Sequence, residues 1–533
     1  MSALPGSVLL GLGFVVSSLF AAPHGQAPGG GEHPLGGERS IPLATSLNVA
    51  HGSHVGAMAD TLRPVGRAGV ERLQVAPLTF EPPRASRHEV DGVTVFHLYD
   101  PTLPLVDLMV QIRGGTGHFP REKMASVSGM ATFVQNGGTQ SLSPDSVALL
   151  ADLLALNMGF ASGGGGTVAS LNTLTGTLDE GLDLFREILT APGFDPEVVE
   201  VWRAQQLEQV RRRTEDPVNL AYQEFNRLMY GDHPVGWVFE EEDLAEERLG
   251  EDRLREIHRA LFCRDRLTLG VAGDVDWDEI RPRIERFLSA WPACESELQP
   301  AAEPEMKRSG AVYILPRETE QTTIILGQPG GTRAEDSSDY FATQVGNLIL
   351  GGGGFTSRLM RRLRTEEGLT YGASSLWTNP RGYEGVFGVV TQTRAERTPD
   401  ALRAIAEILD EFRTTLPEAD ERDRAVDQIA NGYVFAFSSA AQIVARQMNN
   451  HVLDLPEGWL ELFLEGIQAV EPEDIRRVAL EHLEPDAMSV LLVGDATRFD
   501  PRIEGFGPIF RLSPDGAVEP WEHGFRDDRG ESY

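Results

Sequence analysis

Two short motifs recur about 220 residues apart, and this repeat limits the possible folds of the chain more than any other feature. Gly-Gly-Thr at 114–116 returns at 330–332. Val-Ala-Gly-Asp at 271–274 returns as Leu-Val-Gly-Asp at 492–495. Because the two spacings are nearly equal, the sequence indicates duplication of a whole domain rather than a short tandem repeat. A chain of 533 residues is long enough to hold two such domains, each with its own core.

Local patterns within the repeats predict strands interrupted by helices. Apolar runs at 88–100 and 104–116 are typical of two strands joined by a turn-prone segment. Pro217 is expected to stop the helical region, and a strand closes the first repeat. The predicted helices lie at 124–134, 143–158, 178–189 and 196–213, and the closing strand at 267–274. We predict an α+β fold of two duplicated layered α/β domains of about 220 residues, each a mostly antiparallel sheet packed with helices.

Composition along the chain divides it into five segments. Residues 1–22 form a signal or anchor segment, and residues 23–82 a flexible low-complexity lead-in rich in Gly and Pro. A first domain is predicted at 83–292 and a second at 309–533. A Pro- and Glu-rich linker at 293–308 connects them.

The N-terminal segment is typical of an export signal. Residues 8–22 carry no charge and end in two alanines that could adjoin a cleavage site. No Lys or Arg precedes Arg39, so an uncleaved membrane anchor is the alternative. Beyond this segment no run is apolar enough to span a membrane. We expect a periplasmic or extracellular protein, in which Cys263 and Cys294 are either bridged or both free thiols.

The acidic balance of the chain limits its partners. Lys and Arg total 47 against 80 Asp and Glu, which gives a net charge of −33. A field of that sign repels nucleic acid and anionic membrane surfaces, so nucleic-acid binding is not expected. It would attract basic peptides, although acidity also keeps a secreted protein soluble.

A specific string follows the Gly-rich turn at 351–354. It predicts a helix over 357–367, stopped by Gly368, with a β-rich stretch from 369 onward. The string resembles the C-terminal-domain motif of the pitrilysin/insulinase-type zinc metallopeptidases, which include the mitochondrial processing peptidases. The resemblance implies that Arg364 and Tyr371 contact the backbone of a peptide substrate. The alternative is a surface arginine and a packed tyrosine.

The zinc motif of that family has no match here. Active members carry His-x-x-Glu-His on a helix, where both histidines bind zinc and the Glu is the general base. The resemblance places Thr132 and Asn136 at the histidines, Gln135 at the general base and Gln209 at the third ligand. Hydroxyl and amide groups are poor zinc ligands, and Gln135 cannot accept a proton from water. We therefore expect no metal site in this chain, with Thr132 and Asn136 capping a helix or filling a cavity.

The resemblance also implies a role. In several members of the family one subunit binds zinc and a homologous subunit carries the Arg/Tyr pair. We expect a non-catalytic, substrate-binding subunit of an exported heterodimeric metallopeptidase, inactive alone and without a cofactor. It would hold an extended, unfolded peptide for a zinc-bearing partner. The alternatives are a catalytically dead peptide-binding or scaffold protein acting without a partner, and an active enzyme with an unusual metal site.

Overall fold

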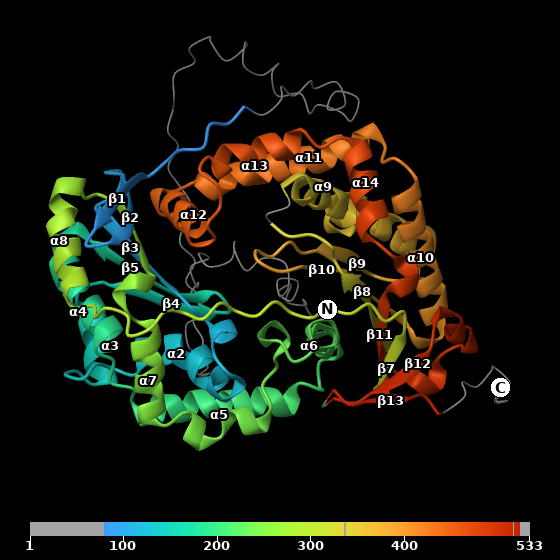
Figure 1. The fold of residues 1–533 in the computed structure, drawn as a ribbon, viewed down its shortest axis with the longest axis horizontal. Coiled ribbons are helices and arrows are strands. Elements are labelled where there is room, and N and C mark those ends of the chain that lie inside the picture. Colours follow the sequence, from blue (N-terminus) through green and yellow to red (C-terminus); the bar gives the residue numbers. More distant parts are fainter. Residues whose placement is uncertain (1–78, 335–336, 515, 523–533) are drawn as a thin grey trace, which may run out of the picture. The chain divides into compact units, whose positions relative to one another are not determined.

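The computed structural model of the chain describes residues 79–334, 337–514 and 516–522. It contains two mixed sheets, one in each half of the chain, and helices pack on both (Figure 1). The expected signal or anchor segment and the lead-in up to residue 78 lie outside the described residues. Within the described ranges, no helix has the length and apolar character that a membrane span requires.

In the first half, the residues from 79 onward form a six-stranded sheet and seven α-helices. Its strands are β1 (Ser86–Val90), β2 (Val93–Tyr99), β3 (Leu105–Arg113), β4 (Asn157–Gly163), β5 (Gly166–Leu174) and β6 (Leu267–Gly273). Its helices are α2 (Met124–Asn136), α3 (Pro144–Leu153), α4 (Leu178–Thr190), α5 (Pro196–Arg212), α6 (Pro217–Tyr230), α7 (Glu251–Leu261) and α8 (Trp277–Ser289). The strand order is β1-β2-β6-β3-β5-β4, with β2 and β6 parallel and the other pairs antiparallel.

The second half forms a seven-stranded sheet. Its strands are β7 (Val312–Pro316), β8 (Gln321–Pro329), β9 (Ala373–Trp377), β10 (Val386–Arg394), β11 (Ser489–Gly494), β12 (Ile509–Leu512) and β13 (Val518–Pro520). Its α-helices are α9 (Ser337–Asn347), α10 (Thr398–Thr414), α11 (Ala419–Val434), α12 (Ala440–Val452), α13 (Trp459–Gln468) and α14 (Pro472–His482). The strand order is β13-β12-β7-β11-β8-β10-β9.

The two sheets repeat one topology, which confirms the predicted duplicated α+β fold. The order β2-β6-β3-β5-β4 in the first sheet matches β7-β11-β8-β10-β9 in the second. In both, the strand that closes the repeat pairs in parallel with the first of these strands and antiparallel with the next. The recurring Gly-Gly-Thr follows β3 and β8, and the recurring Gly-Asp ends β6 and β11. The predicted domain boundaries stay predictions.

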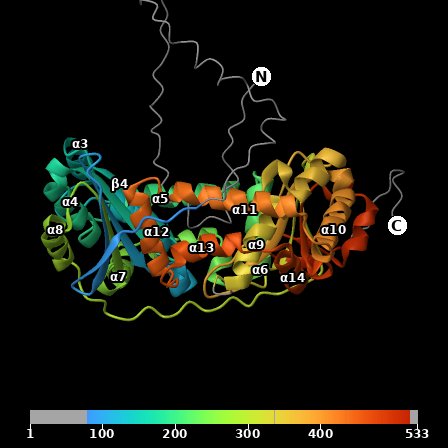
Figure 2. The same cartoon turned by 90° about the horizontal axis from the view of Figure 1, so that it is seen from above.

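Each half contributes one helix to the sheet of the other half. Helix α6 packs on β8 and β11, where Phe225 lies in one core cluster with Ile325 and Leu491. Helix α12 packs on β2 and β6 (Figure 1 and Figure 2). A Cβ on Gly270 would lie 2.4 Å from Val444 Cγ1 and 2.3 Å from Met448 Sδ, so glycine at that point of β6 lets α12 pack closely. Because helices cover both faces, β6 and β11 are buried along nearly their whole length.

The first predicted strand is a hairpin of two strands. Residues 88–100 were expected to form one strand, but β1 and β2 pair antiparallel around Asp91-Gly92. Both turn residues have positive φ, at 50° and 82°. Asp-Gly favours such two-residue hairpins because it tolerates this backbone conformation.

Two helix ends also differ from the predictions. The helix predicted over 143–158 ends at Leu153, since Ala155 adopts φ of 52° and β4 begins at Asn157. Pro217 starts α6 rather than stopping the helical region. It occupies the first turn, and the Asp216 carboxylate accepts hydrogen bonds from the backbone N–H groups of Val218 and Asn219.

An irregular segment connects the halves, and a disulfide ties the start of this segment to the first half. Residues 290–311 contain neither helix nor strand. Cys263, which the first core buries, is bonded to Cys294 in this segment, with the two Cα atoms 5.0 Å apart. This settles the choice left open by the sequence in favour of the bridge.

Candidate functional site

Arg364 contacts two exposed aromatic rings. Its guanidinium carbon lies 4.5 Å from the ring centroid of Tyr371 and 4.8 Å from that of Phe355. Tyr371 is 84% exposed and Phe355 74% exposed, which is unusual for such large rings. A guanidinium over an aromatic face is held by the ring quadrupole, so the three side chains form one surface cluster, called the aromatic–Arg cluster below.

A π-helix presents Arg364. The predicted helix over 357–367 is largely this wider form, which runs from Met360 to Glu366. The backbone N–H of Glu367 bonds to the carbonyl of Arg362, five residues back, and Leu363 is fully buried beneath it. Gly368 then adopts φ of 60° and ends the helix, as predicted. Segments of π-helix are rare and are often found at functional sites.

A buried ion pair fixes the start of this helix. Arg358 donates two hydrogen bonds to the carboxylate of Glu421 on α11, at 2.7 and 3.1 Å. Both side chains are more than nine-tenths buried. Burial alone would raise the pKa of Glu421, but the hydrogen bonds and charge of Arg358 outweigh it and hold that pKa below its ordinary value.

The Gly-rich turn before the helix presents Phe355. A second π-helix, Leu348–Gly352, leads into it, and a Cβ on Gly351 would lie 2.3 Å from the backbone N of Ser375 in β9. Gly354 has φ of 65°, and the buried Ser357 hydroxyl donates to its carbonyl at 2.8 Å. The glycines are therefore needed for close packing and a left-handed turn, while the next residue stays exposed.

Tyr371 lies at the tip of a turn with a fixed backbone. The buried hydroxyls of Thr391 and Thr393 on β10 donate to the carbonyls of Gly372 and Leu369, at 2.8 and 2.7 Å. The backbone N–H of Gly372 in turn donates to the hydroxyl of Thr370. The ring is thus exposed on a rigid support rather than on a loose loop.

Arg364 differs in charge environment from the arginines beside it. Arg358 pairs with Glu421, Arg361 with Glu366, and Arg362 with Glu367 and Glu407. Arg364 makes no ion pair or hydrogen bond with any residue that the structure describes. Its N–H groups are therefore available to an acceptor from outside the chain.

The four positions matched to the zinc motif lie on α2 and α5, which pack against each other. Thr132 and Gln135 are half-buried, and the Gln135 amide donates to the carbonyl of Met158 at 3.3 Å. Asn136 and Gln209 are exposed.

The packing between these two helices is aromatic. Phe133 on α2 and Trp202 on α5 are both buried, with ring centroids 5.1 Å apart. The carboxylate next to Gln209 on α5 is that of Glu208, and Arg212 already pairs with it. This donor set, made of a hydroxyl and three amides, does not fit zinc.

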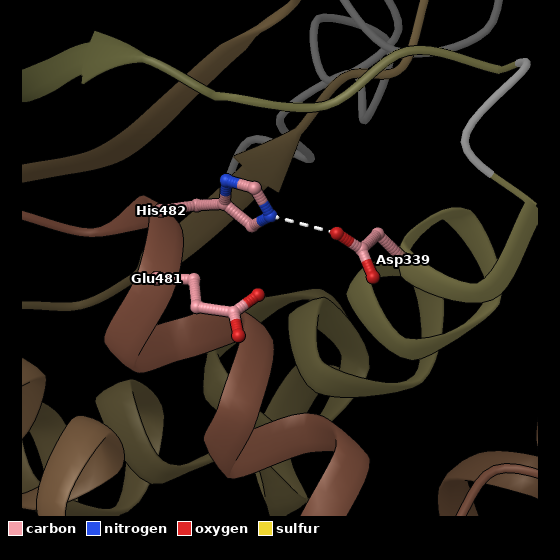
Figure 3. Close-up of side chains that lie close together, drawn as sticks. All are labelled: Asp339, Glu481 and His482. Carbon is pink, nitrogen blue, oxygen red and sulfur yellow. Dashed lines mark hydrogen bonds and ion pairs between the residues drawn. The ribbon is translucent and has the colours of Figure 1, made fainter.

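The group of side chains with the best metal-ligand chemistry lies elsewhere in the described chain. One ligand atom each of Asp339, Glu481 and His482 lie within 4.8 Å of one another, and Figure 3 shows them converging from α9 and the end of α14. His482 Nε2 lies 2.9 Å from Asp339, and Arg477 donates to both carboxylates at 2.8 and 3.0 Å.

This group is an ion-pair network that joins α9 to α14. Burial would raise the pKa of Asp339, but hydrogen bonds from His482 and Arg477 outweigh it and lower the pKa. A cation would have to displace Arg477, so the arrangement favours the charges already present.

Sequence reasoning named Arg364 and Tyr371 but not Phe355. The structure brings all three together. The sequence signal for Phe355 was its position directly after four glycines, because an apolar side chain in a Gly-rich turn is seldom buried.

Comparisons with known proteins agree with the fold. The family described as "Peptidase M16 inactive domain" matches residues 248–429. An uncharacterized zinc protease of Streptomyces coelicolor is 27% identical over 57% of this chain and 66% of its own length. The non-peptidase homolog YmxG of Helicobacter pylori is 22% identical over 79% of this chain and 95% of its own. The crystal structure of a peptidase M16 inactive domain from Pseudomonas fluorescens superposes with a TM-score of 0.69 at 24% identity, covering 78% of this chain and all of that one.

Proposed function

The chain is an inactive homologue of the pitrilysin/insulinase-type (M16) peptidases, and we propose that it is the substrate-binding subunit of a heterodimeric metallopeptidase. In this role it holds an extended peptide, while a homologous partner supplies zinc and the general base. The aromatic–Arg cluster is the observation that carries the proposal. It is built on rigid supports, and its guanidinium pairs with no carboxylate among the described residues.

The difference between the aromatic–Arg cluster and the former zinc positions on α2 and α5 supports a subunit that binds substrate and leaves catalysis to its partner. Four positions on these helices offer neutral oxygen and amide groups, so these positions supply neither zinc ligands nor a base for activating water. Arg364 and Tyr371, the residues proposed to bind the peptide, are held in place by buried contacts. A subunit that binds substrate without cutting it accounts for both observations.

Arg364 and Tyr371 can bind a peptide directly. Guanidinium N–H groups and a phenol O–H are donors, and a peptide carbonyl is the acceptor that an extended substrate offers most often. Donors on a rigid support lose little entropy on binding.

A sheet edge can add main-chain hydrogen bonds to a bound peptide. Strand β4 lies at an edge of the first sheet, pairs with β5, and has no fully buried residue. Strand β9, next to Tyr371, is less accessible because Gly351 lies against the backbone of Ser375. We therefore assign the peptide-pairing edge in this chain to β4.

Export is part of the proposal. The Cys263–Cys294 bridge suits an oxidising compartment such as the periplasm or the extracellular space, because cytosolic thiols are kept reduced. The apolar run at 8–22 is the segment that would direct export or anchor the chain.

Expression with and without a partner tests the proposal. The partner is a homologous chain that contains His-x-x-Glu-His, and the assay is cleavage of an unfolded peptide. We expect co-purification, with cleavage by the mixture and not by this chain alone, and its loss in Arg364→Ala. Arg361→Ala, on the same helix but paired with Glu366, is the matched control and should keep activity. Failure of the partner to co-purify, with no cleavage by the mixture, would instead favour the scaffold alternative.

A further inference from the structure

The charge environment of Arg364 points to the part of a peptide that the cluster binds. Acidic residues outnumber basic ones by 80 to 47, and the neighbouring arginines are paired with carboxylates. Arg364 contacts two rings instead, among the residues that the structure describes. Because the Arg364 guanidinium pairs with no described carboxylate, it can bind a carboxylate that a ligand supplies.

The geometry of the contact limits the ligand further. Aromatic rings interact with the face of a guanidinium and leave the N–H groups at its edge unpaired. These N–H groups form a planar fork that matches the two oxygens of a carboxylate, whereas a peptide carbonyl offers one oxygen. The phenol of Tyr371, whose ring centroid lies 4.5 Å from the guanidinium carbon, adds a further donor.

We propose that the aromatic–Arg cluster binds the terminal α-carboxylate of a peptide. This proposal rests on the proposed function and names its substrate class. The class is peptides whose C-terminal carboxyl group is free, such as the fragments that an endopeptidase releases. An Asp or Glu side chain carries the same chemical group, but a peptide rich in these residues is repelled by a chain of net charge −33. A terminal carboxylate is present even on a basic peptide, which the same field attracts.

Charges near the cluster also favour a terminal carboxylate over the side chain of an acidic peptide. Glu366, Glu367 and Glu407 lie on or beside the helix that carries Arg364, where they pair with Arg361 and Arg362. They make the surroundings of the cluster less favourable for a second negative charge on the ligand. A single carboxylate at the end of a basic chain avoids this repulsion.

Three labelled peptides of one basic sequence test the inference with the purified full chain. The first has a free C-terminal carboxylate, the second a C-terminal amide, and the third an amide plus one internal Glu in place of Gln. Fluorescence anisotropy at low salt gives each Kd. We expect the free acid to bind about tenfold more tightly than either amide, because hydrogen bonds to a charged group each contribute about that factor.

Two variants assign the difference to Arg364. Arg364→Ala should abolish the preference for the free acid, and Arg364→Lys should keep only part of it because an ammonium group lacks the planar fork. Arg361→Ala should leave the preference unchanged. Thermal unfolding of each variant checks that the fold is intact.

The outcomes separate this inference from the proposed function. If the free acid and the amide bind equally and Arg364→Ala weakens both, the cluster does not bind a terminal carboxylate. The proposed function would then stand, with Arg364 binding a peptide carbonyl. Recovery of tight binding by the internal Glu would overturn the choice of the terminal group. Absence of binding by all three peptides would contradict the proposed function itself.

Discussion

The guanidinium of Arg364 contacts the ring of Tyr371 across the end of a helix, with 4.5 Å between the guanidinium carbon and the ring centroid. The contact exists because Gly368 reverses the chain between them with φ of 60°. Any other residue at this position adopts that φ at a cost of roughly 1 kcal/mol. The two side chains are therefore one unit whose geometry is set by the backbone.

Loss of the second ring should weaken peptide binding moderately. Phe355 lies 4.8 Å from the Arg364 guanidinium, and an exposed cation–π contact contributes about 0.5–1 kcal/mol. We expect Phe355→Ala to raise the Kd for a peptide by about two- to fivefold, while Phe355→Tyr keeps the wild-type value. Unchanged binding in the alanine variant would remove Phe355 from the site.

Breaking the buried Arg358–Glu421 pair should destabilise the second half of the chain. Arg358→Ala leaves a buried carboxylate without its partner, which costs about 3–5 kcal/mol. Thermal unfolding should show a clearly lower Tm. Replacing both residues, as Arg358→Met with Glu421→Leu, should recover much of the loss, and a double variant as unstable as the single one would argue against this explanation.

Acidification should destabilise the first half through His258. This buried imidazole bonds to the carbonyl of Leu189, and burial lowers its pKa from 6.5 to about 4. Between pH 6.5 and 4 the unfolded chain therefore binds more protons than the folded one. The stabilisation is complete above pH 6.5 and is lost as the pH falls toward 4, by roughly 3 kcal/mol.

His258→Asn isolates this contribution. Urea unfolding at a series of pH values should show a shallower loss of stability between pH 6.5 and 4.5 in the variant than in the wild type. The comparison uses the slope, because loss of the hydrogen bond to Leu189 lowers stability at every pH. Equal slopes would mean that His258 is not the titrating group.

Reduction of the Cys263–Cys294 bridge should also destabilise the chain. The bridge joins residues 31 positions apart, and closing a loop of that size stabilises a protein by about 2–4 kcal/mol. We expect a lower urea midpoint in the presence of dithiothreitol. The variant with both cysteines replaced by serine should be less stable in either condition and insensitive to the reductant.

Much of the fold could be predicted from the sequence because local patterns and the repeat agreed. Helices α2, α4 and α5 were predicted within a few residues, since apolar periodicity and terminal Pro or Asp residues mark them. The duplicated topology followed from two recurring motifs at strand ends. The Asp91-Gly92 hairpin was missed although its turn residues are a strong signal.

Other features depend on contacts that no local pattern contains. Nothing in the sequence of α6 or α12 shows that each packs on the sheet of the other half. The π-helical form of Met360–Glu366 depends on the burial of Leu363 and on Gly368, and an α-helix has the same apolar signature. The contact of Phe355 with Arg364 depends on the position of this π-helix, so it could not be predicted from the sequence.

The loss of zinc proteolysis can be measured on the purified chain alone, by adding zinc and an unfolded peptide and following the products by mass spectrometry. We predict that the peptide stays intact, since Thr132, Gln135, Asn136 and Gln209 supply neither zinc ligands nor a base. Cleavage by the wild-type chain that disappears in Gln135→Ala would contradict it.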